Sequence, residues 1–421
     1  MQKQDLKKDY LWNTAATFLQ ACISLFLLIW VTRFNGTAHS ALFSSAYGYS
    51  ITLGAIALFG GRNYQVTDSR GEFKTYEYIW ARGFICILTL FIAIAFAFFG
   101  GFDLEKSLVI ISFTVFQVIV SLSEVLFGIM QRHHILYKAG QSNFAKVAIG
   151  MVLFAAVDFV TGSIFYSSLT LIVVALVFLV FIDIPLTRGV EKVQFGAFSV
   201  GEFCKESVRV LSKMFLVALT IVLLGLFANI GRFFIDLYHP DEQAVWGILI
   251  LPASFIFVLV QTIVSPLLKP LSDHFQAESF REFQKVVQKV QYITLGIGLV
   301  IVVLTYFLGV PVLSLVFGLD LTGFEWQLTV TIFGSVFFSL CGAYYNVLTT
   351  MRIVNQQVFL VGIPLLLHIL IAAVGVNLYG MPGAVAAYIG SNIIQAVSCY
   401  LVYNHKLRKL VQGKGSATNS G

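Results

Sequence analysis

Residues 291–318 read QYITLGIGLVIVVLTYFLGVPVLSLVFG, an unbroken run without one charged side chain. A helix of about 20 mainly apolar residues crosses the roughly 30 Å hydrocarbon core of a bilayer, so this run predicts a transmembrane helix. Further runs of the same character fill most of the chain, which predicts an all-α integral membrane protein with about 12 transmembrane helices. The predicted spans are 11–32, 41–61, 79–100, 108–130, 144–160, 163–182, 214–235, 244–267, 291–318, 327–350, 358–379 and 383–403.

The overall composition supports this fold class. Hydrophobic residues make up 58% of the chain and charged residues 11%, whereas a soluble chain of this length needs more charge to cover its surface. The apolar runs are continuous and do not alternate at every second residue, which favours helices over the strands of a β-barrel. The cysteines are scattered without disulfide or metal spacing, and we expect neither a metal nor a cofactor.

The distribution of Lys and Arg predicts the orientation in the membrane. If residue 1 lies in the cytoplasm, 22 of the 27 Lys and Arg residues fall in inside segments. The outside loops then carry only Arg33 and Lys106. We therefore expect a multi-pass protein of the plasma membrane with both termini cytoplasmic. The net charge of +6 follows from this bias and indicates no nucleic-acid partner.

The connector between the sixth and seventh spans divides the chain into two halves. The predicted organisation is an N-terminal six-helix bundle at 1–182, a basic cytoplasmic connector at 183–213, and a C-terminal six-helix bundle at 214–403. Residues 404–421 are polar and basic, and we expect a disordered cytoplasmic tail there.

The two halves also share a weak internal similarity. Span one ends in Arg33-Phe34 and span seven ends in Arg232-Phe233, both at the predicted outer face. Because six is even, both halves begin on the same side of the membrane. This predicts parallel repeats related by an axis along the membrane normal, an arrangement in which transporters often bind substrate between the repeats.

Several local strings point to a known family. They are KDYLWN at 8–13, GRNYQV at 61–66, SDHF at 272–275 and GVPVLSLVFG at 309–318. With the six-plus-six topology, these strings resemble the polysaccharide-transporter branch of the multidrug/oligosaccharidyl-lipid/polysaccharide exporter (MOP) superfamily. The string at 61–66 is similar to teichoic-acid or capsule-precursor flippases.

This resemblance implies a fold and a function. The fold would be a V-shaped pair of six-helix bundles around a central cavity. The function would be a flippase of cell-wall polysaccharide biosynthesis, which moves an undecaprenyl-pyrophosphate-linked oligosaccharide from the inner to the outer leaflet by alternating access. Its partners would be the lipid-linked glycan, membrane lipids and polysaccharide-assembly machinery. The resemblance supplies no catalytic motif, so the candidate residues below come from charge and position.

Five cations are candidates for binding the pyrophosphate, because ionisable groups in membrane spans are costly and often functional. Arg33 and Arg232 lie near the outer face on equivalent spans, and Arg62, Arg82 and Lys146 lie near the inner face. Arginine suits phosphate because its guanidinium makes bidentate hydrogen bonds. The alternative interpretation is that these side chains snorkel to the interface or only set the topology.

Three further groups are candidates for coupling transport to a proton or a sodium ion. Glu124 is the deepest clear acid, and either pairs with Lys146 or binds the coupling ion. Asp158 is either a coupling group or a solvated residue at a span end, and we interpret Asp183 as a boundary residue of the same kind. His368 either relays a proton or forms a neutral interhelical hydrogen bond.

Three functions remain open from the sequence. An anionic lipid-linked glycan fits the excess of cations over acids at the candidate positions. A cation-coupled multidrug exporter of the same superfamily is the alternative, although the first span contains no acid. A membrane enzyme of polysaccharide assembly is the least favoured, because the predicted outer loops are about 8 residues or shorter and carry no catalytic pair. We therefore expect a transporter and not an enzyme.

Overall fold

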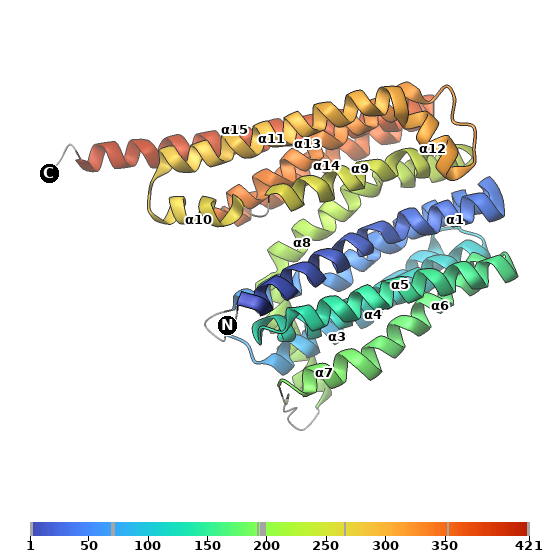
Figure 1. Ribbon diagram of the computed structural model, residues 1–421, viewed down its shortest axis with the longest axis horizontal. Helices are drawn as coiled ribbons and strands as arrows, with labels where there is room; N and C mark the ends of the chain where they lie inside the picture. The colour runs from blue at the N-terminus through green and yellow to red at the C-terminus, as the bar shows by residue number, and fades with distance from the viewer. Residues whose placement is uncertain are drawn as a thin grey trace. The chain divides into compact units, whose positions relative to one another are not determined.

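The computed structural model describes residues 3–68, 72–191, 193, 199–264, 267–351 and 353–418, and all regular structure in these ranges is helical. Eleven of the described helices are long and apolar enough to cross a membrane. One of them, Lys8–Leu58, is long enough for two crossings and contains the first predicted span and most of the second. The prediction of an all-helical membrane protein with about 12 spans is therefore confirmed (Figure 1).

The first part of the chain forms one compact unit, Met1–Asn229, which we call unit 1. In it, α1 packs on α4 and α5, α3 packs on α4, and α6 packs on α4 and α5 (Figure 1). The helices and turns of this part are α1 Lys3–Leu58, α2 Gly61–Thr67, α3 Thr75–Phe99, α4 Leu104–Arg132, α5 Leu136–Thr161, α6 Ile164–Phe178, the π-helical turn Leu179–Asp183, α7 Ile184–Arg188 and α8 Val200–Tyr238.

The rest of the chain forms the second unit, Ile230–Gly421, which we call unit 2. There α13 packs on α9, α11 and α15, and α14 packs on α15. Its further helices and turns are the 3₁₀ turn Pro240–Glu242, α9 Gln243–Val264, α10 Leu268–Gln276, α11 Phe280–Leu304, the π-helical turn Thr305–Gly309, α12 Val310–Phe317, α13 Glu325–Thr350, α14 Val354–Tyr379 and α15 Met381–Thr418.

The units divide inside α8, between Asn229 and Ile230, whereas the sequence placed the connector at 183–213. Phe203, near the start of α8, contacts the rings of Trp80 and Phe84 on α3, at centroid distances of 5.9 and 6.1 Å. These aromatic contacts hold the first half of α8 in unit 1.

Several helices extend beyond the predicted spans. The α8 helix begins at residue 200 where the predicted span begins at 214, and α11 begins at 280 where the predicted span begins at 291. In the segment where the sequence predicted a tail from residue 404, α15 continues to Thr418. Leu407 is buried at 5% exposure, so an amphipathic helix packs on unit 2 where hydropathy alone ends the span.

Each π-helical turn lies just before a proline. Leu179–Asp183 precedes Pro185, and Thr305–Gly309 precedes Pro311. Proline donates no backbone hydrogen bond, and its ring clashes with the carbonyl four residues earlier. A wider turn relieves both effects, and π-bulges are frequent at functional positions. The first turn places Asp183 in the interior of unit 1, at 0% exposure.

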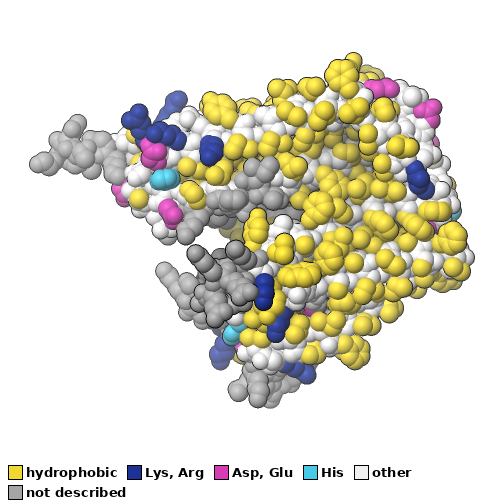
Figure 2. Space-filling model, in the orientation of Figure 1, with side chains coloured by type: hydrophobic (Ala, Val, Ile, Leu, Met, Phe, Trp, Pro, Cys, Tyr) yellow, Lys and Arg dark blue, Asp and Glu magenta, His cyan; other side chains and the backbone are white. Residues whose placement is uncertain are grey.

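Apolar side chains cover much of the visible surface of both units (Figure 2). Exposed examples are Phe91 and Phe98 in unit 1 and Leu299 and Leu315 in unit 2, each more than half exposed. Such continuous apolar surface is unfavourable in water, whereas lipid tails can cover it. The exposed helix faces therefore agree with a multi-pass membrane protein.

Candidate functional site

The candidate site is built around the turn that joins α1 to α2. Helix α1 ends at Leu58, and Phe59 and Gly60 then take positive φ angles of 43° and 64°. Glycine adopts this backbone conformation readily, whereas phenylalanine is strained in it. The turn separates α1 from α2, which starts at Gly61, and Arg62 of α2 then contacts α4.

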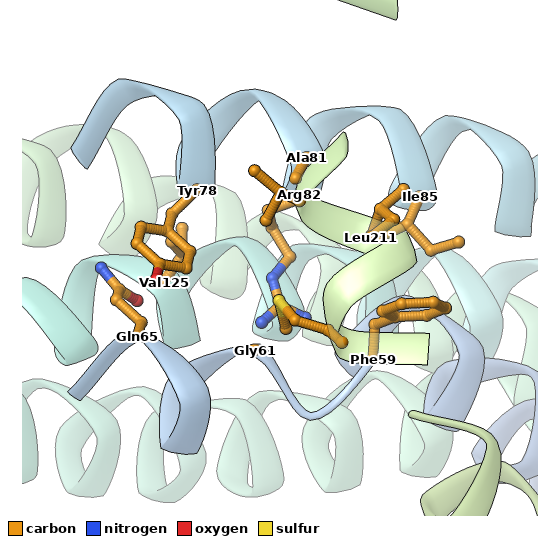
Figure 3. A pocket seen from close by; sticks show the side chains of 11 residues that line it. Phe59, Gly61, Gln65, Tyr78, Ala81, Arg82, Ile85, Val125 and Leu211 are labelled. Atoms are coloured by element: carbon orange, nitrogen blue, oxygen red, sulfur yellow. The ribbon is translucent and has the colours of Figure 1, made fainter. Parts of the chain in front are cut away.

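Arg82 holds this turn from α3. Its Nη1 donates hydrogen bonds to the carbonyl of Ala57 at 2.6 Å, to the carbonyl of Leu58, and to the hydroxyl of Ser121 at 3.1 Å. The last carbonyls of a helix lack intrahelical donors and carry partial negative charge, so the guanidinium satisfies them. Figure 3 shows the Arg82 side chain pointing toward Gly61. A Cβ at Gly61 would lie 2.2 Å from Arg82 Nη2, so a larger residue here would displace the guanidinium of Arg82.

Arg62 forms an ion pair with Glu124. Arg62 Nη1 lies 3.0 Å from Glu124 Oε2, and Arg62 Nε donates to Gln131 Oε1 at 3.2 Å. The Arg62 and Glu124 side chains are 24% and 22% exposed. The pair is therefore partly accessible, and a ligand can compete for Arg62.

These residues line a cavity of about 380 Å³ inside unit 1. Polar and apolar groups from α1 to α5 and from α8 surround it, and two arginines face one carboxylate. The net charge of the lining is therefore positive. The lining residues are Asn13, Thr17, Leu58, Gly60, Gly61, Arg62, Arg82, Glu124, Gln131, Leu136 and Ile221.

The predicted ion pair between Glu124 and Lys146 is wrong. Lys146 Nζ lies 3.4 Å from Asp183 Oδ2 and donates to Ser123 Oγ at 2.9 Å. The Lys146 and Asp183 side chains are 2% and 0% exposed, so Asp183 is not a solvated boundary residue as predicted. Ser142 Oγ completes the shell by donating to Asp183 Oδ1 at 2.5 Å.

Lys146 is therefore the cation of a buried structural pair and is not among the lining residues of the cavity. Its ammonium also lies 5.1 Å from the centre of the Phe127 ring, a cation–π contact. The hydropathy pattern could not show this, because it does not determine which face of each helix points inward.

Asp158 forms a second buried polar cluster in unit 1. Its side chain accepts hydrogen bonds from Asn35 Nδ2 at 3.0 Å to each oxygen, and from Ser167 Oγ at 3.3 Å. Asp158 is 1% exposed, so it is not a solvated residue at a span end. His39, one turn after Asn35, interacts electrostatically with this carboxylate. The cluster joins α1, α5 and α6.

The remaining candidates are not among the residues that line the cavity. Arg33 is exposed on α1 in unit 1, whereas Arg232 lies on α8 in unit 2, so neither unit holds both arginines. His368 is buried in α14, and its ring centre lies 6.3 Å from that of Tyr388. No structural result tests a binding or coupling role for these three residues, which stays a prediction.

Sequence reasoning missed Gln131, Thr17 and Ser121 as parts of the site. Gln131 lies at the end of α4, where the sequence suggested only a boundary between span and loop. Ser121 donates to the carbonyl of Ala57 at 2.8 Å and so supports the same turn as Arg82. Small polar residues inside apolar runs are the signal that could have identified Thr17 and Ser121.

No protein-family model matches the chain, and no curated protein matches its sequence. Its fold, however, is similar to solved transporter structures. An inward-facing multidrug resistance MATE family transporter of the MOP superfamily has a TM-score of 0.68 at 13% identity, covering 93% of this chain and 96% of that chain. The Vibrio cholerae MATE transporter VcmN has a TM-score of 0.63 at 13% identity, covering 96% and 98%.

A third similar structure is a MOP superfamily transporter from Pyrococcus furiosus. It has a TM-score of 0.59 at 13% identity, covering 97% of this chain and 96% of that chain. Its description states that reverse polarity of its binding pocket suggests a different function. Together these likenesses show that the chain has the fold of MATE transporters of the MOP superfamily. They do not distinguish the polysaccharide-transporter branch within it.

Proposed function

We propose that this protein is a transporter that moves an anionic cargo across the membrane by alternating access. The observation that carries the proposal is the cavity of about 380 Å³ in unit 1, where Arg62 and Arg82 face the single carboxylate of Glu124. An incoming phosphate would replace Glu124 as the partner of Arg62, because guanidinium and phosphate form bidentate hydrogen bonds. Solved neighbours of this fold include inward-facing and outward-facing conformations, which supports alternating access.

The more specific proposal is that the cargo is an undecaprenyl-pyrophosphate-linked oligosaccharide or a teichoic-acid-type precursor. The amides of Asn13 and Gln131 and the hydroxyl of Thr17 offer hydrogen bonds to sugar groups in the same cavity. The local strings at 8–13 and 61–66 support the same branch by resemblance. Transport would be driven by an ion gradient, the membrane potential or the flux of substrate.

An apolar groove on the neighbouring surface supports a lipid-linked cargo. Phe59, Val208, Leu211, Ser212 and Phe215 line a groove of about 390 Å³ in unit 1. Phe59 belongs to the same α1–α2 turn whose other residues line the polar cavity. A cargo with a charged head and an apolar tail fits this pairing of surfaces.

A cation-coupled multidrug exporter is the second candidate. Multidrug MATE transporters are among the proteins of similar fold, and on fold alone they favour this candidate over a flippase. The buried Asp158, whose hydrogen-bond donors Asn35 and Ser167 are neutral, offers a coupling site for a proton or sodium ion. The positive balance of the cavity weighs against a cationic drug.

The deciding experiment is depletion of the protein in its native cell, followed by analysis of lipid-linked intermediates. Accumulation of one undecaprenyl-pyrophosphate oligosaccharide, with loss of the matching surface polymer, would establish the flippase. Unchanged intermediates together with new sensitivity to cationic drugs would overturn it in favour of the exporter. In that case, Asp158→Asn should abolish drug efflux while the protein remains in the membrane.

A further inference from the structure

A basic surface lies on unit 2 where α11 begins and α15 ends. Six cations project from these two helix segments, all within the first three turns of α11 or after the last predicted span of α15. Figure 2 shows Lys and Arg side chains gathered at this end of the unit, beside the apolar band. The residues of this basic surface are Arg281, Lys285, Lys289, Lys406, Arg408 and Lys409.

The two helix segments meet at one aromatic contact, and both bury their apolar faces in unit 2. The rings of Phe283 on α11 and Tyr403 on α15 lie 6.5 Å apart between centres. Phe283, Val287 and Leu407 are 0%, 1% and 5% exposed. Because these apolar faces are buried in unit 2, the cations beside them lie on the outer side of both helix segments.

Acidic partners do not neutralise this surface. Lys285 pairs with Glu282 at 2.7 Å, and Arg281 also interacts with that carboxylate. Within the described part of the chain, no carboxylate lies within ion-pair distance of Lys289, Lys406, Arg408 or Lys409. The basic surface therefore keeps an excess of positive charge that is open to an external anion.

The apolar surface of unit 2 begins within two turns of these cations. Tyr292, three residues after Lys289, is 73% exposed, and Tyr400 and Leu401 are 47% and 59% exposed. Exposed tyrosines are typical of the interface between lipid tails and headgroups. The cations therefore lie at the depth of lipid phosphates, next to surface that contacts the tails.

We propose that this basic surface is a binding site for anionic phospholipid headgroups. Each exposed cation near an anionic membrane surface strengthens binding by about fivefold, so several cations on the two helix segments together favour anionic lipids. The lipid phosphates would contact Lys289 on α11 and Lys406, Arg408 and Lys409 on α15. This proposal does not depend on the cargo of the transporter.

The test is a lipid titration of the full chain in neutral detergent, read by native mass spectrometry. Phosphatidylglycerol is compared with phosphatidylcholine, and the fraction of protein with bound lipid is measured. A variant that combines Lys289→Gln, Lys406→Gln, Arg408→Gln and Lys409→Gln should bind phosphatidylglycerol at least about tenfold more weakly. Replacing the lysines by arginine and Arg408 by lysine should preserve binding.

The matched control changes four cations of unit 1, namely Lys138, Arg188, Lys205 and Arg209, to glutamine. The proposal requires this control to bind phosphatidylglycerol like the native chain. An equal loss of phosphatidylglycerol binding in both variants would show that net charge alone governs binding, and it would overturn the proposed site. Equal binding of phosphatidylglycerol and phosphatidylcholine to the native chain would also overturn it. Soluble glycerol phosphate should not compete, because it lacks the tails, and unchanged melting temperatures would show that all variants are folded.

Discussion

Arg62 Nη1 lies 3.0 Å from Glu124 Oε2 at the edge of a cavity whose other charged side chain is Arg82. The carboxylate therefore occupies the position that an anionic cargo needs. Exposed and partly exposed ion pairs contribute at most about 1 kcal/mol, so a phosphate can displace the carboxylate at small cost. This relationship makes Arg62 the most informative residue for mutagenesis.

We expect Arg62→Ala to reduce transport at least about tenfold while leaving protein levels in the membrane unchanged. Arg62→Lys should retain part of the activity, because lysine keeps the charge but loses bidentate geometry. The effect is measured as the amount of surface polymer or the rate of drug efflux, divided by the amount of protein in the membrane. Lys138→Ala is the control, since Lys138 lies in unit 1 but does not line the cavity. Normal transport in Arg62→Ala would exclude the cavity as the cargo site.

The buried pair of Lys146 and Asp183 should govern folding. Asp183→Asn leaves an uncompensated buried ammonium, which typically costs about 3–5 kcal/mol. The double variant Lys146→Met with Asp183→Leu removes both charges and should recover most of that loss. Unfolding in mixed micelles, followed by circular dichroism, measures the stability. A double variant as unstable as Asp183→Asn would contradict this assignment.

Hydropathy was sufficient to predict the transmembrane helices, because membrane insertion depends on a property that each segment carries by itself. Hydropathy did not predict the residues at which these helices begin and end. Helices α11 and α15 continue past the apolar spans because side chains such as Phe283 and Leu407 pack on unit 2, and average hydropathy does not register such single contacts.

The site was predicted only in part for a related reason. Arg62, Arg82 and Glu124 were all named from charge and depth, but their partners depend on how each helix is rotated about its axis. The turn at Phe59 and Gly60 places Arg62 of α2 against α4, and the π-helical turn before Pro185 accompanies the inward position of Asp183. Long-range packing determines the positions of both side chains, and no local sequence pattern predicts that packing.

We expect Arg82 to stabilise the fold of unit 1, whereas the sequence predicted that it binds the headgroup. Arg82→Met removes the side-chain donor for the carbonyl of Leu58, whereas Ser121 still donates to the carbonyl of Ala57. A buried acceptor without a partner costs about 1–3 kcal/mol. We expect a lower melting temperature in detergent and less protein in the membrane. An unchanged melting temperature combined with lost transport would instead favour a direct role in cargo binding.

The end of α4 carries an ion cluster whose effect on stability depends on pH. Glu191 is bonded by His133 Nε2 at 2.9 Å and lies 3.7 Å from Arg132 Nη2. Burial would raise the pKa of Glu191, but hydrogen bonds from Thr75 and His133 and the charge of Arg132 lower it below the usual 4.5.

A carboxylate with a lowered pKa stabilises the fold at pH values above its unfolded pKa, and this contribution disappears as the pH falls through the folded pKa. We therefore expect Glu191→Gln to melt at a lower temperature than the native protein at pH 7. The difference should disappear as the pH falls below about 4.5. Melting curves of both proteins in detergent across this range provide the measurement. Glu206→Gln is a control because Glu206 pairs with an arginine that is 59% exposed, and exposed pairs contribute little. A melting difference for Glu191→Gln that stays constant down to acidic pH would show that its charge has no part in holding α4.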